Sequence, residues 1–210
     1  HIRQKHMSLY DRATAWVEEK LVCDGQCRKF IAVSELTKQI FLQEYRIDPD
    51  RVVVIHPGVH LPDHSPNLKN RVRGTIRREL GIRDEDIVIV FASMNFEIKG
   101  LDSILHSLAR LKSGFKLIVA GKGNTGKYQK IAGEAGIAGN VIFTGVVSKE
   151  RLTDLYLAGD LYMMLSKFDT FGMVVLEAMA AGLPVIVSHN VGAKDLIRSE
   201  EHTSEHQSLS

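Results

Sequence analysis

The segment DTFGMVVLEAMAAGLPVIV (residues 169–187) contains a loop, a helix and a strand in immediate succession. Its apolar residues follow helical spacing over residues 172–181, and Gly182 is the glycine stop that commonly ends a helix. Pro184 then opens the short β-branched run Val185–Val187, which predicts a strand. A helix followed at once by a strand is the repeating unit of a parallel α/β sheet, so this segment predicts the fold class.

The same alternation of strands and helices extends upstream to residue 87. Residues 87–92 form a continuous apolar run, which is typical of a strand buried on both faces. Further strands are predicted at residues 116–120, 141–143 and 161–165. Helices are predicted between them at residues 101–111, 128–136 and 148–158, the last with Ser148 as its N-cap. The short connections predict a Rossmann-like doubly wound parallel sheet with helices on both faces.

The first 58 residues carry too few elements for a complete α/β domain. They contain two strands, predicted at residues 30–33 and 52–55, and two helices, of which one is predicted to begin at Ser34 and end near Tyr45. Residues 56–63 are rich in turn formers and indicate an interdomain linker. We therefore expect residues 1–58 to be the remnant of an N-terminal α/β domain whose beginning is missing, followed by a truncated second domain at residues 59–197.

The last residues, 198–210, show no strand or helix pattern. They resemble the translation of a common sequencing adapter (RSEEHTSELQS), from which His206 departs. We expect a non-native tail here and leave it out of the fold; a natural flexible tail is the alternative.

The composition limits the class of protein. The chain has 210 residues, 44% of them hydrophobic, and its apolar runs are far shorter than the ~20 residues of a membrane helix. A net charge of +2 argues against a dedicated nucleic-acid surface. Cys23 and Cys27 make neither a disulfide framework nor a four-ligand zinc site, so a reducing cytoplasmic location is expected.

The basic run at residues 69–78 is expected to be the solvated face of a helix ending at Gly81.

The loop GKGNTGK (residues 121–127) satisfies two nucleotide-binding patterns at once. As G-x-G-x-x-G it suggests a dinucleotide turn, but the next strand ends without the carboxylate that binds the ribose. As G-x-x-x-x-G-K-[ST] it suggests a phosphate loop, but Tyr128 stands where the Mg²⁺-binding hydroxyl belongs. A flexible glycine-rich loop bordering a pocket at the carboxyl edge of the sheet is the preferred interpretation.

The segment at residues 169–187 contains two acidic residues eight positions apart, Asp169 and Glu177, which are its candidate functional side chains. The backbone amides near Phe171, Gly172 and Met173 are expected to be free at a helix N-terminus, where they favour an anion. Glu177 falls in an otherwise apolar helix, so its carboxylate needs either a cavity or a partner. Spacing alone leaves open whether these acids bind a ligand or bond to neighbouring backbone amides.

Residues 169–186 resemble the E-x7-E region of retaining GT-B glycosyltransferases of family 4, commonly followed by EAMA-x-G-x-PV. Other short segments are similar to the family's motifs and keep their order between about residues 30 and 197. They are IAVS (31–34), VIHPGV (54–59), FEIKGL (96–101), VIFTG (141–145) and GAKD (192–195). Within the family, residues 95–100 most resemble the lipopolysaccharide core glucosyltransferase branch.

The resemblance implies the donor-binding half of an enzyme that transfers a sugar from a nucleotide-diphosphate sugar, often UDP-linked, with retention of configuration. It implies that Lys99 and the helix N-terminus stabilise the leaving diphosphate. Asp169 would then bind sugar hydroxyls, and Glu177 the ribose. The catalytic residues implied are Lys99, Asp169 and Glu177; the donor-binding residues are Gly121, Lys122, Phe143, Thr170, Phe171, Gly172, Met173 and Glu177.

The implied partners follow from the same resemblance. The acceptor would be a glycan or a lipid-linked sugar such as the lipopolysaccharide core, with contact to the inner membrane face through the missing N-terminal domain. The resemblance implies no metal or other cofactor, and no nucleic acid is expected as a partner. The chain by itself is expected to be inactive, since the acceptor side is absent.

Two departures from the family pattern keep alternatives open. Asp169 stands where the family usually has Glu, and Met94 and Ile98 stand where an Arg usually accompanies the lysine. The diphosphate would then depend on another cation such as Lys122. A non-catalytic nucleotide-sugar binding module is one alternative. An NAD-binding domain that uses the Gly121 loop is the other.

Overall fold

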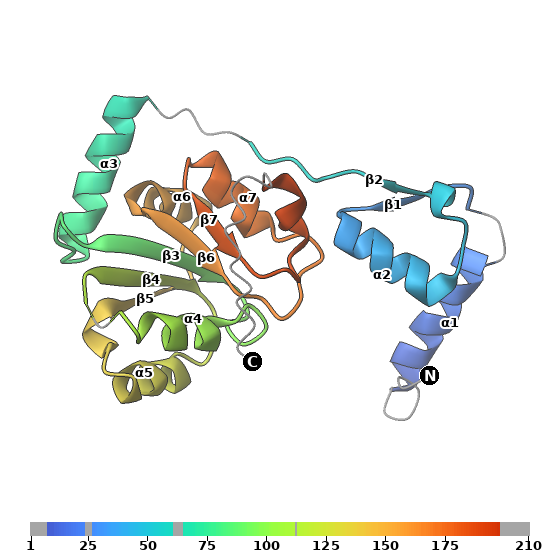
Figure 1. Cartoon of the computed structure of the whole chain (residues 1–210), viewed down its shortest axis with the longest axis horizontal. Coiled ribbons are helices and arrows are strands. Elements are labelled where there is room, and N and C mark those ends of the chain that lie inside the picture. Colours follow the sequence, from blue (N-terminus) through green and yellow to red (C-terminus); the bar gives the residue numbers. More distant parts are fainter. Residues whose placement is uncertain (1–7, 24–26, 61–64, 112, 198–210) are drawn as a thin grey trace, which may run out of the picture. The chain divides into compact units, whose positions relative to one another are not determined.

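The computed structural model of the protein describes residues 8–23, 27–60, 65–111 and 113–197 (Figure 1). The chain divides into two compact units, residues 1–56 and 57–210, and each is described by itself. The tail expected at residues 198–210 lies outside the described residues.

The first unit contains a parallel pair of short strands. Its elements are α1 (Leu9–Cys23), β1 (Phe30–Ala32), α2 (Glu35–Tyr45), the 3-10 helix η2 (Pro49–Arg51) and β2 (Val52–Val54). β1 and β2 pair in parallel, with Phe30 opposite Val52. Ser34 caps α2, because its hydroxyl accepts the backbone N–H of Thr37 at 3.1 Å. The two predicted strands and the capped helix are confirmed, whereas the sequence did not locate α1.

The second unit alternates strands and helices as predicted. Its helices are α3 (Pro66–Glu79), α4 (Leu101–Leu108), α5 (Thr125–Glu134), α6 (Lys149–Ala158) and α7 (Met173–Ala180). Its strands are β3 (Ile87–Ser93), β4 (Phe115–Gly121), β5 (Val141–Gly145), β6 (Leu161–Met164) and β7 (Val185–Val187). Two 3-10 helices complete it, η3 (Ala138–Asn140) and η4 (Gly192–Leu196).

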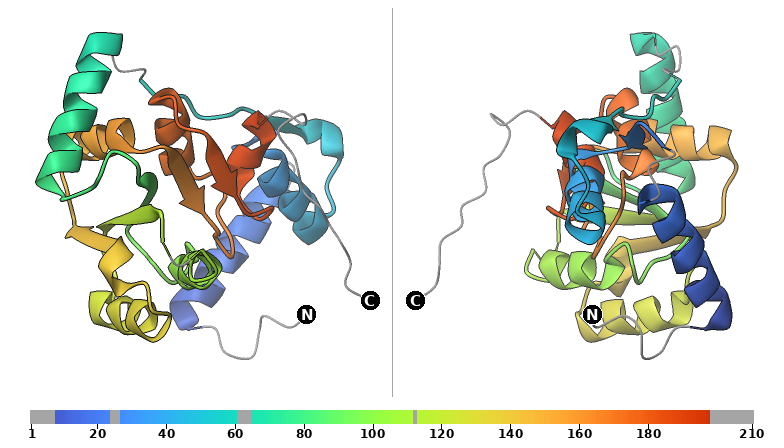
Figure 2. Two further views of the ribbon diagram at one scale, coloured as in Figure 1. Left: turned by 60° about the vertical axis from the view of Figure 1, so that its left-hand side comes forward. Right: turned by 90° about the vertical axis from the view of Figure 1, so that its right-hand side faces the viewer.

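Within the described residues, these strands form one five-stranded sheet in the order β5-β4-β3-β6-β7, and every neighbouring pair is parallel. The chain starts at the central strand β3, builds outward to β5, and returns through α6 to build the other half. As a result, α4 and α5 cover one face, and α3, α6 and α7 cover the other (Figures 1 and 2). The predicted doubly wound α/β fold is confirmed.

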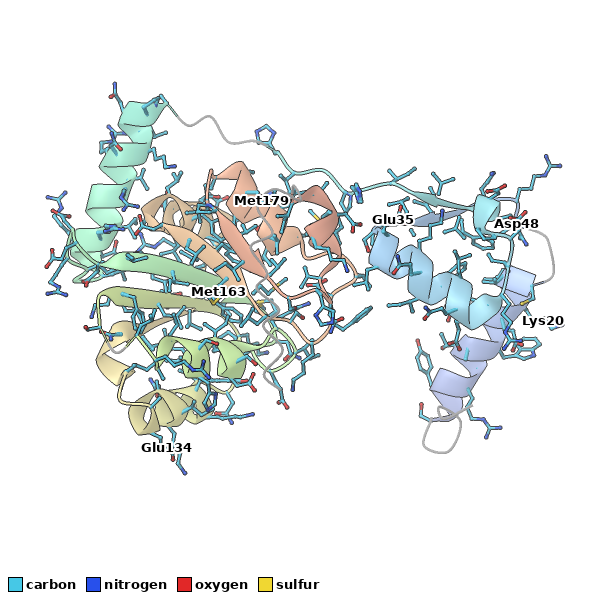
Figure 3. All side chains as sticks on the ribbon, in the orientation of Figure 1. Lys20, Glu35, Asp48, Glu134, Met163 and Met179 are labelled. Atoms are coloured by element: carbon cyan, nitrogen blue, oxygen red, sulfur yellow. The ribbon has the colours of Figure 1, made fainter. Side chains whose placement is uncertain are left out.

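The core of this unit lies beneath α4 and α5. β3 is buried from Val88 to Ala92, as expected for a strand covered on both faces. The helix side chains Leu101, Ile104 and Leu105 are fully buried against it. Met163 of β6, labelled in Figure 3, belongs to the same cluster. This packing fixes the strand ends from which the loops of the carboxyl edge start.

The basic run of α3 is not wholly solvated, contrary to the prediction from the sequence. Arg77 is only 3% exposed rather than solvated. Its guanidinium donates to the Asp160 carboxylate at 2.5 Å and to the Ala158 carbonyl at 3.2 Å. Arg73 donates to the other oxygen of Asp160 at 2.6 Å. The two arginines therefore anchor α3 to the amino edge of the sheet, because Asp160 immediately precedes β6.

Candidate functional site

The loops that follow β3 and β6 meet at the carboxyl edge of the sheet, where ligands of such sheets bind. The carbonyl of Ile98 accepts two hydrogen bonds from the β6 loop, from the Lys167 N–H at 2.9 Å and from the Ser166 hydroxyl at 3.0 Å. Gly100 has φ 77°, and a Cβ there would lie 1.9 Å from the Leu165 carbonyl oxygen. Only glycine permits this approach, which brings Lys99 beside the β6 loop.

Lys99 and Asp169 form a partly buried ion pair at this junction. Lys99 Nζ lies 2.5 Å from Asp169 Oδ2, and the two side chains are 24% and 14% exposed. These residues are 70 positions apart, and the sequence implied that both belong to one site. The structure brings them into direct contact.

Asp169 also closes the loop that leads into α7. Its Oδ1 accepts the backbone N–H of Phe171 at 3.2 Å. Its own backbone bridges to the segment before η4, with the Asp169 N–H donating to Asn190 at 2.9 Å and the Gly192 N–H donating to Asp169 at 3.1 Å. The expected free amide at Phe171 is therefore occupied. The amides of Gly172 and Met173 meet no backbone acceptor among the described residues.

The start of α7 is shaped by Gly172, whose φ of 93° lies in the left-handed region. A Cβ there would lie 3.0–3.3 Å from the side chains of Met164, Val191 and Val175, so the site is too tight for a larger residue. Phe171 is buried at 3% exposure, whereas Met173 is 39% exposed. Thr170 is exposed as well. At the start of α7, Phe171 and Gly172 are therefore buried, whereas Thr170 and Met173 on either side of them are exposed.

Glu177 lies one turn further along α7 and lines a pocket of about 170 Å³ between α7, α6 and residues 58–60. The polar lining comes from Glu177, Lys149, Thr153, His60 and Tyr156. Half-buried Glu177 therefore faces a cavity, which favours the ligand-binding alternative over the bond to backbone amides. Lys99 and Asp169 do not line this pocket.

Two of the three glycines of the 121–127 loop, Gly121 and Gly123, have a packing reason. A Cβ at Gly121 would lie 1.8 Å from the Ser93 carbonyl oxygen, and one at Gly123 would lie 2.2 Å from the Phe96 ring. These glycines let the loop pack on the start of the β3–α4 connection. That requirement accounts for them without a pyrophosphate.

Lys122 and Phe143 lie apart from the ion pair. Lys122 lines a pocket of about 340 Å³ together with Asn95, Glu97 and Lys127, and neither Lys99 nor Asp169 lines it. Phe143 is half-buried in β5 and packs on the core cluster. The geometry thus gives Lys122 no part in the Lys99–Asp169 cluster.

Two features of the edge were not predicted from the sequence. One is an apolar pocket of about 110 Å³ whose lining includes Gly121, Val146, Val147, Leu152 and Val174. Val146 is 63% exposed in the loop after β5, and an apolar pair in such a loop was the available signal. The other is Tyr156, which looks like an ordinary core position on α6 until the pocket is seen.

Two family models match the chain. The model described as "Glycosyl transferases group 1" matches residues 72–206, and the model described as "Glycosyltransferase Family 4" matches residues 1–62.

Curated relatives match over most of the chain. An uncharacterized glycosyltransferase of Methanocaldococcus jannaschii is 30% identical over 173 residues, which cover 81% of this chain and 44% of the relative. A D-inositol 3-phosphate glycosyltransferase of Mycobacterium marinum is 33% identical over 179 residues, covering 82% and 37%. The chain thus spans less than half the length of these relatives.

Solved structures share the fold. WaaG, a glycosyltransferase involved in lipopolysaccharide biosynthesis, matches with a TM-score of 0.69 at 23% identity, covering 93% of this chain and 55% of WaaG. Anabaena HepE in complex with UDP and glucose matches with a TM-score of 0.72 at 23% identity, covering 87% and 51%. The solved structures that share this fold are GT-B glycosyltransferases.

Proposed function

Because the chain belongs to the glycosyl transferases group 1 family, we propose that it carries the donor side of an enzyme that transfers a sugar from a nucleotide-diphosphate sugar to an acceptor. The observation that carries this proposal is the Lys99–Asp169 pair at the N-terminus of α7. It places an ammonium group, a carboxylate and a helix N-terminus at the carboxyl edge of one parallel sheet. These are the groups that a sugar diphosphate requires.

The proposed roles follow from charge. As the bond from the sugar to the diphosphate breaks, negative charge grows on the leaving phosphate oxygens. The Lys99 ammonium has three donors and uses one on Asp169, so it can also donate to the diphosphate. The amides of Gly172 and Met173 add donors at the positive end of α7. Asp169 would accept hydrogen bonds from sugar hydroxyls, and Glu177 from the ribose.

The base and ribose would occupy the two pockets beside α7. The apolar pocket lined by Val146, Val147 and Val174 suits the faces of a planar base. Leu152 lines this pocket and also the Glu177 pocket, so the two are adjacent. A nucleoside could therefore place its base in one and its ribose in the other. HepE, which shares the fold, is described in complex with UDP, which supports uracil as the proposed base.

The finer features of the reaction are proposals that rest on the sequence motifs. Retention of configuration is proposed from the resemblance of residues 169–186. The similar proteins act in different pathways by their names: one group is named for D-inositol 3-phosphate, and WaaG for lipopolysaccharide biosynthesis. The proposal of a glycan or lipid-linked acceptor of the lipopolysaccharide core therefore rests only on the resemblance of residues 95–100. The acceptor side would come from a complete N-terminal domain, and we expect no transfer by these 210 residues alone.

The proposed location is the cytoplasm, with contact to the inner membrane face through the N-terminal domain. No helix in the described ranges is long and apolar enough to cross a bilayer. The proposed reaction uses no metal, and in the described part of the chain no group of three His, Cys, Asp or Glu side chains is placed to hold one. Metal independence stays a prediction.

The proposal is tested by titrating the 210-residue chain with UDP, ADP, GDP and NAD in a calorimeter. We expect a uridine or other nucleoside diphosphate to bind and NAD not to bind, with the same affinity in the presence of EDTA. Binding of NAD alone would favour the dinucleotide alternative. Binding of UDP without transfer by a version extended to a complete N-terminal domain would favour a non-catalytic nucleotide-sugar binder.

A further inference from the structure

The hydroxyl of Tyr156 is a buried polar group without a partner. Tyr156 lies in the last turn of α6, and the whole residue is 2% exposed. Among the described residues its hydroxyl makes no hydrogen bond. A buried hydroxyl without a partner is costly, so such groups in a folded protein require an explanation.

This hydroxyl belongs to a residue that lines the same pocket as Glu177. The Glu177 carboxylate lies close enough to raise the pKa of this hydroxyl, although no hydrogen bond joins the two groups in the free protein. Burial raises the pKa of Tyr156 well above its ordinary value, and the neighbouring Tyr162 and Glu177 raise it further. Tyr156 therefore keeps its proton at neutral pH and can act only as a neutral O–H donor or acceptor.

The pocket offers few other donors for the Glu177 carboxylate. Its remaining polar side chains are Lys149 and Thr153 of α6 and His60 of the preceding segment, all more exposed than Tyr156. A carboxylate has two oxygens that can accept hydrogen bonds from the two hydroxyls of a vicinal diol. The orientation of the carboxylate decides whether both oxygens accept from the diol or only one. A fixed donor on one oxygen would therefore decide which way the other points.

We infer that Tyr156 is a positioning residue that donates its O–H to Glu177 when a ribose enters the pocket, and so turns the carboxylate toward the ribose diol. This inference rests on the proposed function and adds a residue to it. Binding of the diol turns the Glu177 carboxylate so that one of its oxygens accepts the Tyr156 O–H. The hydroxyl that is unsatisfied in the free protein thus gains its hydrogen bond only when a nucleotide is bound.

The test compares UDP with 2′,3′-dideoxy-UDP, which lacks both ribose hydroxyls, by calorimetry on the 210-residue chain. The wild-type protein is expected to prefer UDP. Tyr156→Phe should weaken UDP binding about 10-fold, as expected for one hydrogen bond to a charged group, and should leave dideoxy-UDP binding nearly unchanged. Its melting temperature should not fall, because the variant removes an unpartnered oxygen and no packing volume.

Tyr162→Phe is the matched control. The Tyr162 ring packs edge-to-face on Tyr156 with centroids 5.9 Å apart, but its hydroxyl donates to the Ala92 carbonyl at 3.4 Å and does not line the pocket. We expect it to keep the wild-type preference for UDP over dideoxy-UDP. Glu177→Gln combined with Tyr156→Phe should be no worse than Glu177→Gln alone, since the two side chains act as one unit.

The outcomes separate the inference from the function on which it rests. Absence of UDP binding in the wild-type protein would overturn both. UDP binding with the same preference in Tyr156→Phe as in the wild type would overturn the inference alone. A marked fall in the melting temperature of Tyr156→Phe would also overturn it, because the hydroxyl would then have a partner in the free protein.

Discussion

Each edge of the five-stranded sheet holds a partly buried carboxylate, which pairs with two arginines at the amino edge and with one lysine at the carboxyl edge. At the amino edge, Asp160 accepts from Arg73, Arg77 and the Val88 N–H. Arg77 in turn donates to backbone carbonyls around it, so nearly every donor and acceptor of this cluster is used. A cluster with so few spare donors fixes elements in place but has little left with which to bind a ligand.

The carboxyl edge is different, because it keeps unused groups. The Lys99 ammonium donates one of its three N–H groups to Asp169, and the Tyr156 hydroxyl has no partner among the described residues. A polar group without a partner is costly where it is buried, as the Tyr156 hydroxyl is, and a partly exposed ammonium such as that of Lys99 keeps donors that a ligand can use. We therefore predict that the amino edge serves stability and the carboxyl edge serves binding, and the following changes test that division.

The largest effect on stability is expected at the amino edge. Asp160→Asn leaves the guanidinium of buried Arg77 without a counter-charge, which should cost about 2 to 4 kcal/mol in the free energy of unfolding. Urea denaturation measures this loss, and UDP affinity in the folded fraction should be unchanged. Glu79→Gln is the control, because it removes an exposed pair with Arg151 that should contribute about 0 to 1 kcal/mol. Equal effects of the two variants would contradict a structural role for the amino edge.

The same carboxylate predicts a pH dependence. Burial alone would raise the pKa of Asp160, but the hydrogen bond from Val88 and the charges of Arg73 and Arg77 hold it below its ordinary value. A lowered folded-state pKa gives stability that is present above the unfolded value of about 3.9 and is lost as the pH falls through the folded value. The stability difference between wild type and Asp160→Asn should therefore be constant above about pH 5 and shrink below pH 4. A difference that grows on acidification would refute this assignment.

The next effect is on binding at the carboxyl edge. Lys99→Ala removes the ammonium group proposed to contact the diphosphate, and should weaken UDP binding by about 1.5 to 3 kcal/mol. The melting temperature should change little, since the pair with Asp169 is still partly solvated. Lys130→Ala is a suitable control, because the Lys130 side chain is 78% exposed on α5, where it forms an exposed pair with Glu134. Unchanged UDP affinity in Lys99→Ala would remove Lys99 from the site.

The smallest effect is expected for Asp169→Glu, which restores the family's usual side chain. Asp169 contacts Lys99 with one oxygen and the Phe171 N–H with the other. A side chain longer by one methylene cannot keep both contacts without a shift of the loop, so we expect a loss of about 1 kcal/mol in donor affinity. Calorimetry with a UDP-sugar measures it. A clear gain in affinity, or in turnover by the complete enzyme, would show that the shorter acid is a handicap.

Much of the second unit was determined by local sequence. The apolar run of β3, the Ser148 cap of α6 and the Gly182 stop of α7 each act through neighbouring residues, so their positions were predicted to within a few residues. The ion pair of Lys99 with Asp169 was implied as a shared site by motif resemblance. Helix α1 was not located, because its amphipathic pattern is weak.

The tertiary structure alone decided how these groups are used. A basic run has the same pattern whether solvated or buried, and only the packing of α3 on α6 showed that Arg77 reaches Asp160. The amide of Phe171 is taken because Asp169 turns back onto it, and Lys122 lines a different pocket from Glu177. Tyr156 gives no signal in a helical apolar stripe, since the groups that surround its hydroxyl, Tyr162 and Glu177, belong to other elements of the fold. Sequence therefore determined the order of the elements and the residues at the edge, while the contacts between distant segments decided which of those residues remain available to a ligand.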